Sequence, residues 1–181
     1  HLPELLGERT TRIVGTDYNA KTIEWCNEAF PGSEFYRNGL NPPLPFEDDT
    51  FDAVYNYSVF THLSKVVQLA WAMELHRVVK PGGIVISTTH GDRFTYLLSS
   101  SQERKTYEEG EAVIQGRYKE GGKWFFSIHP EAFVRNTLLR DFDEVQRLPT
   151  EPEDELTQDV WLARKAAAPA QPEAPAASGE G

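Results

Sequence analysis

Short apolar segments alternate with amphipathic segments along most of this 181-residue chain, and this alternation restricts the fold more than any other feature. The apolar segments have the β-branched and aromatic content of strands, whereas residues 19–30 and 64–78 place apolar side chains on one helical face. Strands that alternate with helices at this spacing form a parallel sheet, so we predict an α/β fold. The predicted strands are residues 11–17, 34–37, 51–57, 84–88, 144–148 and 159–163, and a further helix is predicted over 131–140.

The composition disfavours several classes of function. A formal net charge of −10 argues against nucleic acid or an anionic membrane as the main partner, because both repel an acidic protein. The single cysteine, Cys26, cannot form an internal disulfide or a multi-cysteine zinc site, and no apolar run reaches the ~20 residues of a membrane span. No spacing of potential ligands suggests a metal. We therefore expect a cytoplasmic protein that acts on a small molecule, with no nucleic acid, membrane or metal.

The ends of the predicted strands are the places where a ligand is expected. In open parallel sheets, ligands bind beyond the carboxyl ends of the strands. Asp17 ends the first predicted strand, and a carboxylate there can accept hydrogen bonds from both hydroxyls of a ribose. Asp17 can equally be a helix cap or a loop charge, so this residue alone does not decide the function.

An ordered set of motifs resembles the class I S-adenosylmethionine-dependent methyltransferases, in the type 11/25 small-molecule group. The family has an acidic residue after its second strand, a polar residue after its third, LPFxDxxFD before its fourth and RVLKPGG before its fifth. The corresponding segments here are Asp17, Asn38-Gly39, LPFEDDTFD at 44–52, FTHL at 60–63 and RVVKPGG at 77–83. The likeness is good over residues 11–90 and looser near the end of the chain.

This resemblance implies a Rossmann-like, doubly wound sheet that is mostly parallel with an antiparallel last strand. It also implies S-adenosylmethionine as the cofactor and an in-line methyl transfer to an oxygen, carbon or nitrogen nucleophile. Asp17 would hold the ribose, and Asn38 would face the edge of the adenine. KPGG would end a helix before the next strand. The full set of implied cofactor-binding residues is Asp17, Tyr18, Asn38, Gly39, Asn56, Tyr57 and Ser58.

Two departures from the family pattern matter. The glycine-rich loop after the family's first strand is absent, so we expect this chain to lack that strand and to be part of a longer enzyme. A sheet without this central strand would have two unpaired edges, and we expect such a chain alone to be poorly stable or unable to bind the cofactor. The [DN]PP[YF] signature of amino-group methyltransferases is also missing after the strand at 51–57, which favours a small-molecule acceptor.

Residues 92–127 interrupt the alternation with seven aromatic side chains and a balanced set of charges. An insertion of this length after a central strand is often a lid over a ligand site, and here its composition favours an apolar or sugar-like acceptor. His62, His90 and His129 lie near strand ends or this insertion, and each can serve as a general base. We predict His62 and His90 as the catalytic residues, although each of the three histidines can also have a purely structural role.

Two other functions fit the same residues. A nicotinamide-dependent oxidoreductase can also place Asp17 on a ribose, but the chain has no GxGxxG loop and no YxxxK motif. A non-catalytic methyltransferase-like module would use the fold only to bind a partner. For the domain organisation, we predict a partial methyltransferase domain over 1–165, including the lid at 92–127, and a disordered Ala/Pro-rich tail over 166–181.

Overall fold

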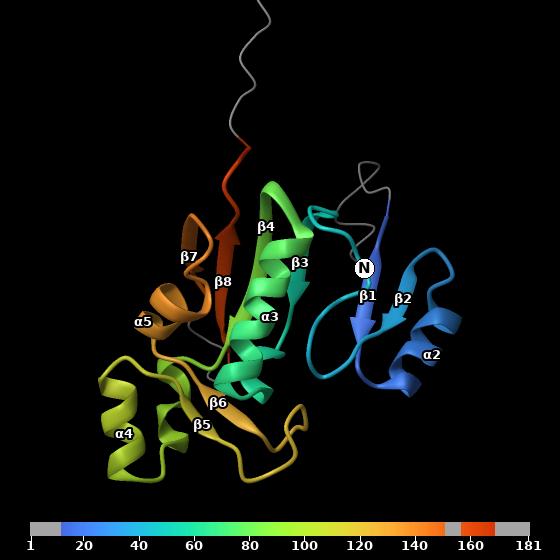
Figure 1. Cartoon of the computed structure of the whole chain (residues 1–181). Coiled ribbons are helices and arrows are strands. Elements are labelled where there is room, and N and C mark those ends of the chain that lie inside the picture. Colours follow the sequence, from blue (N-terminus) through green and yellow to red (C-terminus); the bar gives the residue numbers. More distant parts are fainter. Residues whose placement is uncertain (1–11, 151–156, 169–181) are drawn as a thin grey trace, which may run out of the picture.

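The computed structural model describes residues 12–150 and 157–168, which form an α/β structure (Figure 1). The predicted tail lies almost entirely outside these residues. In chain order the elements are β1 (Val14–Asp17), α2 (Ala20–Ala29), β2 (Glu34–Arg37), β3 (Phe51–Asn56), η2 (Phe60–His62), α3 (Lys65–Val78), β4 (Val79–Thr89), η3 (Asp92–Leu97), α4 (Ser101–Glu108), β5 (Val113–Gln115), β6 (Phe126–Ile128), α5 (Glu131–Phe133), η4 (Val134–Leu138), β7 (Glu144–Leu148) and β8 (Asp159–Arg164).

The strands form three sheets. Strands β1 and β2 pair in parallel, and a four-stranded sheet has the order β3-β4-β8-β7. Strands β3 and β4 are parallel, whereas β8 runs antiparallel to both of its neighbours. The prediction of a mostly parallel sheet with an antiparallel last strand is therefore confirmed. In residues 12–150 and 157–168, no strand joins β1 to β3, and the strand that the resemblance places between them is not among the described elements.

The main core lies on one face of the four-stranded sheet. Val85 of β4 and Trp161 of β8 are fully buried there, in one cluster with residues of α3 and of the segment α5–η4. Figure 1 shows where these helices and strands lie. Alternate residues of a strand point to opposite faces, so the neighbouring positions face the other side. On that other side the cover is incomplete, and Tyr55 of β3 is 56% exposed. The strand prediction located these elements, but not which face is covered.

Helix ends follow the sequence signals closely. Asn19 precedes α2, and its side-chain oxygen accepts a hydrogen bond from the Lys21 N–H at 3.0 Å, as expected for a capping residue. Helix α3 ends at Val78, immediately before KPGG, and Gly82 has a φ of 79°. This left-handed conformation is the one that glycine adopts most easily. However, β4 begins at Val79 rather than at residue 84, so KPGG forms the start of the strand instead of a loop before it.

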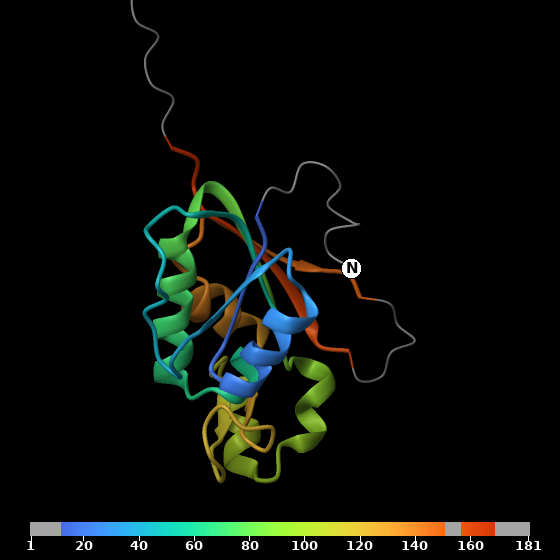
Figure 2. The same cartoon turned by 90° about the vertical axis from the view of Figure 1, so that its right-hand side faces the viewer.

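The insertion after β4 is more regular than its sequence suggests. It contains η3, α4 and the strands β5 and β6, which pair antiparallel. In Figures 1 and 2 this small unit lies below the carboxyl end of β1. The next segment departs from prediction, because the helix expected over 131–140 is a short α-helical turn followed by the π-helical turn η4. Within the described ranges, no helix is both long and apolar enough to cross a membrane.

Candidate functional site

Three polar residues meet at the carboxyl ends of β1 and β2. The Asn38 N–H donates to the Asp17 carbonyl oxygen at 3.1 Å, so the two strand ends are held together. The Asp17 carboxylate oxygen Oδ1 accepts from the Asn19 N–H at 2.7 Å. The Asn38 side chain donates to the Gly39 carbonyl oxygen, while its own Oδ1 is buried and has no partner in the described structure. A buried acceptor without a partner is costly, and a ligand donor would satisfy it.

The end of β3 provides a second group of predicted residues. The Asn56 side chain donates to Ser87 Oγ at 2.7 Å, and its Oδ1 is also buried without a partner among the described residues. Tyr57 is 62% exposed. Ser58 has a φ of 57°, a left-handed conformation that is rare for serine and that turns the chain sharply after the strand. Strained residues of this kind concentrate at functional sites.

The Ser58 hydroxyl lies at the centre of a polar cluster. It is 3.0 Å from the Thr61 hydroxyl and 3.5 Å from His62 Nε2. The Gln158 side-chain amide donates to Ser58 Oγ at 2.8 Å, although the two residues are a hundred positions apart in the chain. Thr88 Oγ1, in turn, accepts from the Ser58 N–H and donates to Gln158 Oε1. The carboxyl ends of β3 and β4 are thereby linked to the start of β8.

His62 has the arrangement of a potential general base. Its Nδ1 is 2.8 Å from the Phe125 carbonyl oxygen. A carbonyl can only accept, so Nδ1 carries the proton and Nε2 of the neutral ring keeps its lone pair. The side chain is half-buried, and Nε2 lies near the Ser58 hydroxyl. The position of His62 thus permits proton uptake at Nε2.

His90 and His129 are enclosed much more completely. His90 is 5% exposed and stacks on Phe94 with ring centroids 4.1 Å apart. Burial, followed by the charge of His62, lowers the pKa of His90 to about 4. His129 is fully buried, and burial lowers its pKa to about 3. The rings of His62 and His90 are 6.4 Å apart, so the structure brings both predicted catalytic residues together but gives them different environments.

The loop between β5 and β6, residues 116–125, connects the two groups of predicted residues. The Tyr18 hydroxyl donates to the Gly121 carbonyl oxygen at 2.8 Å. The Gly121 N–H donates to the His62 carbonyl oxygen at the same distance. Gly121 has a φ of 79°, and a Cβ there would lie 2.8 Å from Leu40 Cδ1. The loop therefore contacts both the end of β1 and the turn that carries His62.

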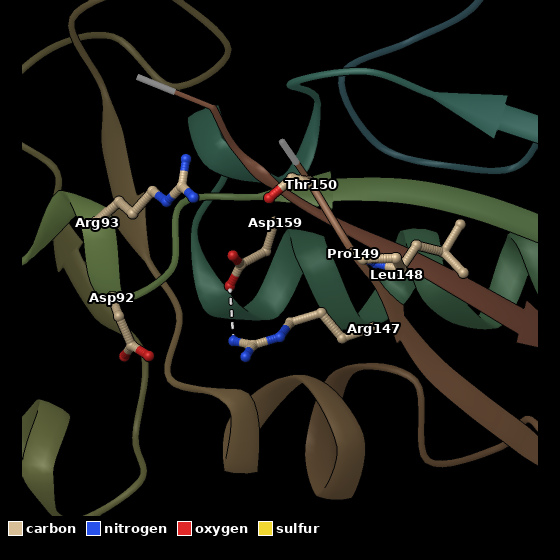
Figure 3. A pocket seen from close by; sticks show the side chains of 7 residues that line it. All are labelled: Asp92, Arg93, Arg147, Leu148, Pro149, Thr150 and Asp159. Carbon is tan, nitrogen blue, oxygen red and sulfur yellow. Dashed lines mark ion pairs between the residues drawn. The ribbon is translucent and has the colours of Figure 1, made fainter. Parts of the chain in front are cut away.

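A pocket of about 290 Å³ lies between the start of η3, the end of β7 and the start of β8 (Figure 3). Its charged side chains are of both signs, and Arg147 and Asp159 point toward one another with 3.6 Å between Nη1 and Oδ2. Burial raises the pKa of Asp159. No sequence pattern singles out this pocket, because its residues are far apart in the chain and become neighbours through the antiparallel pairing of β8. The lining residues are Asp92, Arg93, Arg147, Leu148, Pro149, Thr150 and Asp159.

Within residues 12–150 and 157–168, no group of three or more His, Cys, Asp or Glu side chains could hold a metal ion. Cys26, on α2, is half-buried and unpaired.

Comparison with known proteins shows a similarity to one family over the first half of the chain. A family model described as "Methyltransferase domain", of type 11, matches residues 1–87. Over these residues the chain is similar to the methyltransferases of the type 11 group. A probable S-adenosylmethionine-dependent methyltransferase of Mycolicibacterium smegmatis is 30% identical over 86 residues, which are 48% of this chain and 32% of that protein. An uncharacterized methyltransferase of Schizosaccharomyces pombe is 32% identical over 106 residues, which are 53% of this chain and 36% of that protein.

Comparison with solved structures shows that the similarity in fold extends over most of this chain. An S-adenosylmethionine-dependent methyltransferase from Methanosarcina mazei aligns with a TM-score of 0.59 at 21% identity, covering 87% of this chain and 83% of that one. The Burkholderia thailandensis 1,6-didemethyltoxoflavin-N1-methyltransferase, solved with 1,6-didemethyltoxoflavin and S-adenosylhomocysteine, aligns with a TM-score of 0.57 at 16% identity, covering 88% and 63%. The predicted Rossmann-like class I fold is confirmed. This chain spans about a third of the length of its curated relatives.

Sequence reasoning missed Thr61 and Thr88 of the polar cluster, and it also missed Gln158. The only sequence signal was its position directly before a predicted closing strand. Its side-chain contacts are with Ser58 after β3, Thr88 of β4 and His90 after β4. The pattern of a single strand cannot show such contacts, because they depend on which strands become neighbours.

Proposed function

We propose that this methyltransferase-family chain is the cofactor-binding part of an enzyme that transfers a methyl group from S-adenosylmethionine to a small-molecule acceptor. The observation that carries the proposal is that two strand ends, those of β2 and β3, each hold a buried acceptor without a partner among the described residues, Asn38 Oδ1 and Asn56 Oδ1. The ends of β1, β2 and β3 also supply a carboxylate and exposed aromatic rings. This donor and acceptor set fits an adenosyl group with an attached amino acid.

Each predicted residue at these strand ends has a defined role in the proposal. The Asp17 carboxylate accepts from the ribose hydroxyls, because β1 ends there and only one of its oxygens is engaged by the Asn19 N–H in the contacts given above. Asn38 Oδ1 accepts from the exocyclic amine of adenine, and the Gly39 backbone lies beside it. Tyr18, 43% exposed, packs against the adenine. Asn56, Tyr57 and Ser58 line the amino-acid end.

The cofactor supplies an electrophilic methyl group on a sulfonium. Most of the acceleration in such a displacement can come from proximity and alignment of the acceptor. Where the acceptor must lose a proton, His62 takes it at Nε2, since Nδ1 is occupied by the Phe125 carbonyl oxygen. We assign this role to His62 rather than to His90, because His90 is almost completely buried and its lowered pKa disfavours proton uptake.

The acceptor side of the proposed site is formed by the insertion. Its three exposed aromatic side chains, Tyr96, Tyr118 and Trp124, are between 58% and 64% exposed, and the Tyr118 and Trp124 rings are 6.5 Å apart. The insertion has six acidic and six basic residues over 92–127, so it offers no strong field to a highly charged polymer. These features support an apolar or sugar-like small molecule as the acceptor.

Transfer of a labelled methyl group from S-adenosylmethionine to a panel of small hydroxyl, amine and carbon nucleophiles tests this function. Trp124→Ala and Tyr118→Ala are expected to lower kcat/KM for an accepted substrate by about 10-fold or more, because each loses contact area with it. Trp25→Ala, which removes a 60% exposed ring from α2, is the matched control and should leave turnover unchanged. Unaltered turnover in both insertion variants would contradict the assigned acceptor site.

A further inference from the structure

We infer that Gln158 is a positioning residue for this site. Its side-chain amide orients the Ser58 hydroxyl and keeps Nε2 of His90 unprotonated, which leaves His62 as the histidine at these strand ends that takes up a proton. The inference rests on the proposed function for the role of His62. The hydrogen bonds of Gln158 follow from interatomic distances and do not depend on the proposed function.

The orientation of the Gln158 amide follows from its neighbours. The Ser58 N–H donates to Thr88 Oγ1 at 2.8 Å, so the Thr88 hydroxyl remains able to donate its own proton. Gln158 Oε1 lies 2.5 Å from Thr88 Oγ1, a distance typical of O–H···O and too short for N–H···O. The oxygen of the amide therefore faces Thr88. The amide nitrogen consequently faces Ser58 Oγ at 2.8 Å and His90 Nε2 at 3.3 Å.

This orientation determines the tautomer of His90. An amide nitrogen carries two protons and no acceptor, so both the Ser58 oxygen and His90 Nε2 must accept from it. The neutral His90 ring then carries its single proton on Nδ1, a buried atom, and a hydrogen bond of the His90 ring to the Ser127 backbone partly offsets the lowering of its pKa. A proton added at Nε2 would meet the amide protons of Gln158, so the contact itself opposes protonation of His90.

The same amide also restricts the Ser58 hydroxyl. Because Ser58 Oγ accepts from Gln158, its own proton is directed to either Thr61 Oγ1 or His62 Nε2. The Thr61 hydroxyl has a competing acceptor in the Ser58 carbonyl oxygen at 3.0 Å. When the Thr61 hydroxyl donates to the Ser58 carbonyl oxygen, Thr61 Oγ1 at 3.0 Å is the nearer acceptor for the Ser58 proton, and the lone pair of His62 Nε2 remains available.

Several other titratable or charged groups lie on the elements packed around His90. They are His62 on η2, Asp92 and Arg93 on η3, His129 after β6, and Asp159 at the start of β8. Among them, His62 is the group whose positive charge lowers the pKa of His90. A carboxylate in place of the Gln158 amide would act in the opposite direction, as it can only accept and attracts a proton to Nε2.

Nitrogen-15 spectra of the histidine rings, recorded on the whole protein as a function of pH, test the inference. In the unmodified protein we expect His90 as the Nδ1–H tautomer, with no titration above pH 5. In Gln158→Glu we expect a proton on His90 Nε2 and a titration midpoint at least two pH units higher. Gln146→Glu makes the same chemical change at an exposed position of β7 and should leave His90 unchanged.

An Nε2–H tautomer of His90 in the unmodified protein overturns the inference, and this measurement does not require a folded variant. An unaltered His90 in folded Gln158→Glu also overturns it. The pH dependence of the methyl-transfer rate gives a separate readout. We expect one ionisation in the unmodified protein and two in Gln158→Glu. If the chain transfers no methyl group from S-adenosylmethionine, the proposed function fails while the ring spectra still decide the role of Gln158.

Discussion

At the scale of single residues, Gly91 is the described glycine at which an added Cβ would come nearest to another atom. A Cβ built there would lie 1.9 Å from Asp159 Oδ2, so it cannot fit without moving β8 or the carboxylate. We expect Gly91→Ala to lower the free energy of unfolding by about 1–3 kcal/mol, as overpacking does elsewhere. Chemical denaturation measures this loss. Gly32→Ala is the control, because nothing lies within 4 Å of a Cβ there, and an equal loss in both variants would refute the argument.

The residue scale also shows what sequence can and cannot reveal. Asp17, Asn38 and Ser58 could be singled out because each directly follows a strand, and strand ends are readable from the apolar pattern. The left-handed backbone of Ser58 and the burial of His90 could not, since both depend on neighbours brought by other strands. The placement of the individual site residues on the cofactor stays a prediction.

At the scale of elements, one hydrogen bond joins the loop over residues 116–125 to the end of β1. Tyr18→Phe removes the hydroxyl that donates to the Gly121 carbonyl oxygen. We expect trypsin to cleave this variant several-fold faster after Arg117, Lys119 or Lys123, because the loop opens more often. Tyr36→Phe, which removes a hydroxyl bonded to Glu34 on β2, should not change cleavage there. Equal rates for Tyr18→Phe and the unmodified protein would contradict this role.

Element existence was easier to predict than element boundaries. The six predicted strands are all present, because each has β-branched or aromatic residues in a short segment next to turn signals. The extra length of β4 was missed, as Lys80-Pro81-Gly82-Gly83 carries turn signals yet continues from a strand that starts at Val79. The helix at 131–138 was predicted correctly in place but not in geometry, because a π-helical turn leaves no mark in apolar spacing.

At the scale of the whole molecule, two enclosed histidines couple stability to pH. The pKa values of His90 and His129 in the folded chain are about 4 and about 3, below the ordinary value of 6.5. Between these values the unfolded chain binds protons that the folded chain does not, so stability falls as the pH decreases below about 6.5. The loss is up to roughly 2 kcal/mol per histidine between pH 6.5 and pH 5.

Urea unfolding at a series of pH values from 7.5 to 5 measures this dependence. Titration toward the isoelectric point near 5.0 reduces the net charge and by itself would increase stability, so the two effects have opposite signs. Substitution of His129 by leucine should reduce the pH dependence. An unchanged pH dependence in folded His129→Leu would contradict the enclosed, neutral state of His129.

We propose that the strand ends of this chain bind the adenosyl group through Asp17. Calorimetric titration with S-adenosylhomocysteine tests it most directly, comparing the unmodified protein with Asp17→Asn, which keeps the acceptor for the Asn19 N–H but loses the charge. We expect the unmodified protein to bind S-adenosylhomocysteine and Asp17→Asn to bind it at least 10-fold more weakly, since a charge-assisted hydrogen bond is lost. Asp143→Asn, before β7, should bind normally. Equal affinity in Asp17→Asn and the unmodified protein would contradict the claim.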